Sequence, residues 1–180
     1  MAERGVLHVA LAYPASLAAP LAGLVVLAAS WPATLRAGAV LALVLAGLGA
    51  WTLIEYLLHR WMLHGVDPFR AWHLAHHADA CAPIRVPVVF SALLVLGLVG
   101  VPALLFGRGG IAVPLSAGLL LGNVLQEAVH YRLHDTRPVG RWLEDKRRLH
   151  GFHHFHDERR GYGTLTDFWD RCFGTLPPRP

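Results

Sequence analysis

Charged side chains are scarce in this chain. Asp, Glu, Lys and Arg make up 16% of its 180 residues, whereas hydrophobic residues make up 54%. Ordinary soluble domains carry about 25% charged residues, so the composition argues against that class. The net charge of +4 does not by itself indicate nucleic-acid binding, because such proteins combine a basic face with an otherwise soluble surface. The composition favours a membrane protein.

Cysteine is scarce as well. Cys81 and Cys172 are far apart in the sequence and match no paired spacing for a metal or redox site. The two cysteines therefore constrain the function little. The length leaves room for one domain, and we expect residues 1–180 to form a single membrane-embedded domain.

Long uncharged stretches are what the sequence has instead. Four of them approach the ~20 residues that a helix needs to cross a bilayer, at about 7–30, 37–58, 86–106 and 111–129. They predict an all-α integral membrane protein with four transmembrane helices, and a cytosolic helical cap at 59–85 and 130–180. Pro14 and Pro20 leave a re-entrant or interfacial first segment open, because proline tends to kink a helix.

The basic residues are distributed unevenly about these stretches. If all four cross the membrane, both termini and the cap share one side, which carries fourteen of the sixteen Lys and Arg residues. Arg36 and Arg108 alone lie in the opposite loops. An excess of Lys and Arg is typical of the cytoplasmic face, so we expect a multi-pass protein with its cap and both termini in the cytoplasm.

Histidines are concentrated on that same side. Of the twelve in the chain, ten form four clusters, and His8 and His156 are left over. Residues three or four apart on a helix share a face, so each triplet is expected to direct three imidazoles to one point, and His130 and His134 to pair in the same way. His59 and His64 are five apart, so they need a helix end, a π-bulge or two different metals.

A metal site explains these clusters better than the alternatives. A histidine charge sensor would bring together rings that disfavour one another's protonation, and the clusters are too varied in spacing for a low-complexity tract. Ten imidazoles are too many for one ion, whereas two ions with about five nitrogens each use them all. Imidazole suits several metals. We expect iron, because a site facing an apolar substrate needs a redox metal and dioxygen, although zinc can occupy the site in purified protein.

Several motifs together resemble the fatty acid hydroxylase and sterol desaturase superfamily of membrane diiron enzymes. They are "EYLLHRWMLHG", "HLAHH", "VHYRLHD" and "RRLHGFHH", followed by "GYGTLTDFWDRCFGTLP". The resemblance runs from about Trp51 to the end of the chain, apart from the third hydrophobic stretch. The closing segment is most similar to the fatty acid 2-hydroxylase branch. The resemblance implies a dioxygen-dependent monooxygenase that hydroxylates a lipid acyl chain beside its carboxyl carbon.

The resemblance also implies the metal ligands. These are His59, His64, His73, His76, His77, His130, His134, His150, His153 and His154. We expect four carboxylates to act around them as outer-shell partners of the imidazoles: Glu55, Glu127, Asp135 and Asp157. Asp167 and Asp170 are expected to cap or pair locally.

Three questions stay open on the sequence. Only eight residues separate His64 from His73, a spacing closer to that of carotenoid ring hydroxylases, so a carotenoid hydroxylase or a lipid desaturase is an alternative. A metal-binding transporter or sensor is a weaker one, because transporter ligands lie near the bilayer midplane. The resemblance also implies a separate electron-donor protein, which we expect to dock on the basic residues Lys146, Arg147 and Arg148.

Overall fold

The computed structural model of the chain describes residues 10–12, 15–32, 35–80, 82, 85–107, 110–135, 137 and 140–178. The chain divides into two compact units: Met1–Trp51 with Ile84–Val124, and Thr52–Pro83 with Leu125–Pro180. We call them unit 1 and unit 2. Helices α2 (Ala37–Leu57) and α5 (Ala112–Leu133) each begin in unit 1 and end in unit 2.

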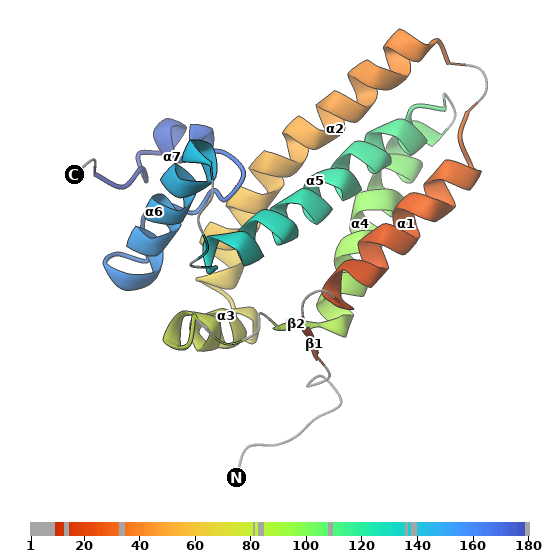
Figure 1. Cartoon of the computed structure of the whole chain (residues 1–180). Coiled ribbons are helices and arrows are strands. Elements are labelled where there is room, and N and C mark those ends of the chain that lie inside the picture. Colours follow the sequence, from red (N-terminus) through yellow and green to blue (C-terminus); the bar gives the residue numbers. More distant parts are fainter. Residues whose placement is uncertain are drawn as a thin grey trace. The chain divides into compact units, whose positions relative to one another are not determined.

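Unit 1 contains the long apolar helices. After strand β1 (Ala10–Ala12) and a 3₁₀ turn at Ala15–Leu17 come α1 (Ala18–Ala29) and the first part of α2. Strand β2 (Arg85–Pro87), α4 (Val88–Phe106) and the first part of α5 complete the unit. Strands β1 and β2 are antiparallel, with Leu11 opposite Val86. Helix α1 packs against α4 (Figure 1).

Close packing of α2 against α5 depends on glycine. A β-carbon on Gly47 would overlap the carbonyl oxygen of Leu115, and one on Gly118 would overlap the carbonyl oxygen of Val44. The two backbones therefore approach without intervening side chains, as small residues allow between membrane helices. The two helices run side by side in Figure 1.

Three helices in the described part of the chain are long and apolar enough to cross a membrane: Ala37–Leu63, Val88–Phe106 and Ala112–Leu133. Their outer side chains are exposed, up to 88% for Leu104. Exposed apolar surface on this scale favours contact with lipid. The last three predicted spans thus lie in helices of sufficient length.

The first predicted span, at about 7–30, is shorter than expected. Its described apolar helix covers Ala15–Ala29, which at ~1.5 Å per residue is shorter than the ~30 Å hydrocarbon core. Pro20 lies in the first turn of α1, where a missing backbone N–H is tolerated. Pro14 lies outside the described residues, as do residues 7–9 of the predicted span.

Unit 2 has a polar interior. It contains the end of α2, a π-helical turn at Leu58–Leu63, α3 (Phe69–Ala78), the end of α5, α6 (Arg141–Phe155) and the short α7 (Phe168–Cys172). Its most buried side chains are Tyr56, His153 and Asp170, each at most 1% exposed. Buried polar groups require hydrogen-bond partners. The contacts that the buried polar groups of unit 2 make define the candidate site.

Candidate metal centre

The ten clustered histidines lie in two groups of five, all in unit 2. Within each group the candidate ligand nitrogens are within 4.8 Å of one another. Group 1 consists of His59, His64, His73, His77 and His153, and group 2 of His76, His130, His134, His150 and His154. His156 belongs to neither group and is exposed, and His8 lies outside the described residues.

The π-helical turn brings His59 and His64 together. The backbone N–H of His64 donates to the carbonyl of His59 at 3.2 Å, which is the i to i+5 bond of a π-helix. Residues five apart therefore share a face here, although in an α-helix they would not. Of the three arrangements that the sequence left open, the structure has the π-helical one, and the turn ends at His64.

Both histidine triplets are divided between the groups, so the expectation that each meets at one point was wrong. On α3, His73 and His77 enter group 1 and His76 enters group 2. Adjacent residues on a helix point about 100° apart, whereas residues four apart share a face. The same rule on α6 directs His150 and His154 to group 2 and His153 to group 1. Each helix therefore serves both groups.

The nitrogen spacing in each group suits a metal ion. The Nε2 atoms of His59 and His73 are 3.0 Å apart, and those of His76 and His130 are 3.3 Å apart. Metal–nitrogen bonds of ~2.0–2.1 Å place neighbouring ligand nitrogens about 2.9–3.4 Å apart at octahedral to tetrahedral angles. Five converging imidazoles cannot all satisfy one another by sharing protons. This donor set fits a transition-metal ion in each group.

Burial keeps these imidazoles neutral. Loss of hydration, followed by repulsion from His134, lowers the pKa of His76 to about 3. Burial likewise lowers the pKa of His64 and His134 to about 4. Neighbouring imidazoles add to the effect of burial in lowering the pKa of His153. At neutral pH these rings therefore carry a free lone pair, the form in which histidine binds metals.

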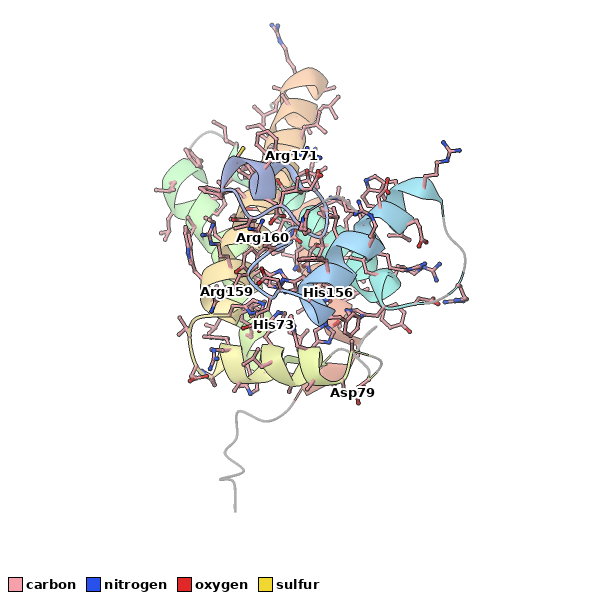
Figure 2. The ribbon with its side chains drawn as sticks, turned by 90° about the vertical axis from the view of Figure 1, so that its left-hand side faces the viewer. His73, Asp79, His156, Arg159, Arg160 and Arg171 are labelled. Atoms are coloured by element: carbon pink, nitrogen blue, oxygen red, sulfur yellow. The ribbon has the colours of Figure 1, made fainter. Side chains whose placement is uncertain are left out.

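The loop after α6 contacts three histidines of group 1. The Nδ1 atom of His59 donates to the carbonyl oxygen of Tyr162 at 2.6 Å, and that of His153 donates to the carbonyl oxygen of Arg160 at 2.9 Å. A carbonyl only accepts, so both rings carry their proton on Nδ1 and present the Nε2 lone pair to the group. Glu158 lies 3.8 Å from Nδ1 of His64. Figure 2 labels Arg159 and Arg160 in this loop, with His73 on α3.

These contacts were missed in the sequence. A backbone carbonyl has no residue identity that a pattern can reveal. Glu158 was also missed. Its nearness to His64 depends on how the loop folds back, whereas the spacing argument considered only neighbours along one helix.

Three of the four predicted outer-shell carboxylates have hydrogen bonds or ion pairs to groups other than imidazoles. Glu55 accepts from the backbone N–H of Thr164 at 2.8 Å and from its hydroxyl. Asp135 binds two arginines, at 2.6 Å and 2.7 Å. Asp157 accepts from a backbone N–H at 3.0 Å, and Glu127 lies in α5, three residues before His130. Their action on the imidazoles stays a prediction.

Apolar helices of membrane-spanning length and two five-histidine groups define a class of membrane protein whose histidine cluster is compatible with metal binding. A comparison with protein families identifies the particular family. The fatty acid hydroxylase family model matches residues 44–175, and the chain belongs to that family.

The chain is similar to proteins named as hydroxylases. A dihydroceramide fatty acyl 2-hydroxylase of Arabidopsis thaliana is 31% identical over 147 residues, which cover 73% of this chain and 59% of the relative. The fatty acid 2-hydroxylase of Homo sapiens is 34% identical over 149 residues, covering 76% and 40%. The chain thus spans less than two thirds of these relatives.

A solved structure resembles the whole fold. The structure of full-length scs7p, in which only the hydroxylase domain is visible, matches with a TM-score of 0.82 and 25% sequence identity. The match covers 94% of this chain and 68% of scs7p.

Proposed function

We propose that residues 1–180 form one hydroxylase domain that adds a hydroxyl group to the acyl chain of a membrane lipid, at the carbon next to the carboxyl carbon. The observation that carries this proposal is the pair of five-histidine groups. Support comes from the family and from relatives named fatty acid 2-hydroxylase and dihydroceramide fatty acyl 2-hydroxylase.

The proposed cofactors are two iron ions, one held by each group of five histidines, with dioxygen as the co-substrate. Bound iron would supply the redox chemistry needed to activate dioxygen against an unreactive C–H bond, which non-redox zinc does not.

The chain contributes orientation and charge. The carbonyls of Tyr162 and Arg160 hold two rings in the tautomer that presents Nε2. Neutral imidazoles leave the positive charge of the ions uncompensated, so nearby carboxylates would stabilise it. Glu158, at 3.8 Å from His64, joins Glu55, Glu127, Asp135 and Asp157 as a candidate for that role.

We propose that the centre faces the cytoplasm. Only Arg36 and Arg108 lie in the loops on the opposite side of the predicted spans, as the positive-inside rule requires. The short first helix changes this count little, since Arg4 is the sole basic residue before it.

Replacement of one histidine from each group tests the function. We expect His77→Ala and His154→Ala each to abolish the hydroxylated lipid and to lower the bound metal, because each removes one nitrogen from a five-member group. His156→Ala is the matched control, since this ring is exposed and outside both groups.

The readout is mass spectrometry of lipids from cells with and without the protein. Retained activity in either group variant would remove that histidine from the ligand set. New double bonds in acyl chains would indicate a desaturase and not an acyl hydroxylase. Hydroxylated pigments would indicate a carotenoid hydroxylase.

A separate electron-donor protein is proposed to dock on the basic cap. Lys146 is unsuited to that contact, because it is only 7% exposed. Arg147 bonds Glu144 and the carbonyl oxygen of Arg137. Arg148 is exposed, so Arg148→Glu is the variant that should slow reduction by an acidic donor. An unchanged rate of reduction would exclude Arg148 from the docking surface.

A further inference from the structure

Asp170 is the most buried carboxylate of the closing segment, at 1% exposed. One carboxylate oxygen accepts from the backbone N–H of Tyr162 at 3.0 Å, and the other from that of Gly163 at 2.9 Å. The hydroxyl of Thr175 donates to the first oxygen at 2.7 Å. Three donors thus converge on one buried anion, and hydrogen bonds to a charged acceptor are the stronger kind.

The peptide units that Asp170 holds are directly connected to group 1. The carbonyl of Tyr162, whose N–H is bound by Asp170, accepts from Nδ1 of His59. Two residues earlier, the carbonyl of Arg160 accepts from Nδ1 of His153. Asp170 thus binds the peptide unit that carries the first of these acceptors, and its hydrogen-bond partner Thr175 binds, through the N–H of Gly161, the unit that carries the second.

The backbone of this loop, residues 160–163, has little freedom to adopt another conformation. Gly161 has φ of +78°, and a β-carbon on Gly163 would overlap the carbonyl oxygen of Thr166 and lie 3.1 Å from Asp170. The N–H of Gly161 also donates to the carbonyl of Thr175 at 2.9 Å. The loop is thus fixed from both sides, by α7 and by Thr175.

Two rings of group 2 lack this support among the described residues. The Nδ1 atoms of His150 and His154 are buried and have no hydrogen-bond partner in the described part of the chain. Asp167, the other aspartate expected to cap or pair locally, makes contacts that differ from those of Asp170. Asp167 pairs with Arg171 at 2.6 Å on the surface.

We infer that Asp170 is a positioning residue for one of the two metal sites, the one formed by group 1, and acts through the backbone of residues 160–163. The inference rests on the proposed metal-binding role of the histidines. Outer-shell partners of metal-bound histidine typically contribute about 10–100-fold to metal affinity, and we expect Asp170→Asn to weaken group 1 by that factor. Asparagine keeps the size of the side chain but turns one acceptor into a donor that faces an N–H.

Backgrounds in which one group is weakened make the test selective. In the full chain, His134→Ala removes a ligand from group 2, and His64→Ala removes one from group 1. Zinc affinity is measured in each background, with and without Asp170→Asn, by competition with a chelator and metal analysis. We expect the second substitution to weaken zinc binding about 10–100-fold in His134→Ala, and to change it little in His64→Ala.

Equal weakening in both backgrounds would show a general folding role and overturn the inference, as would unchanged affinity in His134→Ala. Asp167→Asn is the matched control, because it lies three residues away and bonds neither Tyr162 nor Gly163; it should leave both affinities unchanged. If Asp170→Asn does not fold, Thr175→Val removes one donor to the same carboxylate and should weaken group 1 in the same direction. Wild-type protein that binds no zinc would reject the metal role itself, a result distinct from a loss of group selectivity.

Discussion

At the scale of single residues, the carbonyl oxygens of Tyr162 and Arg160 orient two rings of group 1, those of His59 and His153. Histidine spacing identified all ten members of the two groups. Their division between the groups was not recognised, because the triplets were treated as single faces although adjacent residues on a helix diverge. The carbonyls of Arg160 and Tyr162 have no signature in the sequence, and their role depends on the fold of the loop.

Glu55 supports a stability prediction at this scale. It accepts two bonds from Thr164 and is 5% exposed, so Glu55→Ala would leave a buried N–H without its acceptor. We expect a loss of about 1–3 kcal/mol in the free energy of unfolding. Glu55→Gln retains an acceptor oxygen and should lose less.

Unfolding of the detergent-solubilised protein, followed by circular dichroism, measures both variants. Glu144→Ala is the control, since its partner contact with Arg147 is at the surface and exposed ion pairs contribute little. Equal losses of unfolding free energy in Glu55→Ala and Glu55→Gln would contradict the role of the Glu55 carboxylate oxygen as the acceptor for Thr164.

At the scale of helices, hydrophobic length predicted three of the membrane segments well. The first was overestimated, because the uncharged stretch contains a strand and a 3₁₀ turn before α1 begins. Strand β1 pairs with β2, more than 70 residues later in the chain, and such long-range pairing leaves no local pattern. The π-helical turn was one of several open arrangements, since five-residue spacing alone does not select it.

The α2–α5 contact yields a prediction for these elements. Gly118→Ala places a β-carbon against the carbonyl oxygen of Val44, so the helices must separate and lose packing. We expect a lower melting temperature in detergent. Gly97→Ala in α4 meets no atom within 4 Å and should be neutral or slightly stabilising, because alanine favours a helix by about 0.5–1 kcal/mol. A Gly118→Ala protein as stable as Gly97→Ala would refute the close approach.

At the scale of the whole molecule, all ten histidines belong to unit 2, whereas the glycine contact belongs to unit 1. Composition predicted a membrane protein, and the length of the chain predicted one domain. The division into two compact units was not predicted, because its boundaries fall inside α2 and α5, where the sequence shows no linker.

Metal binding should therefore stabilise the two units differently. A ligand that binds only the folded state adds about 2.7 kcal/mol at a concentration 100 times its Kd. We expect zinc or iron(II) to slow amide hydrogen exchange in residues 64–80 and 141–163, and to leave 88–106 nearly unchanged. Hydrogen exchange with mass spectrometry, with and without a chelator, measures this. Uniform protection along the chain would contradict a metal effect confined to unit 2.

The division of each triplet between the two groups has a consequence for how such a protein can change over generations. A single insertion within "HLAHH" or "HGFHH" would rotate members of both histidine groups at once, since α3 and α6 each supply both groups. Neither group can be lost by altering the length of one of these helices while the other group is kept. The two groups are thus inherited as a pair, and a descendant with one group would have to arise by replacing individual imidazoles.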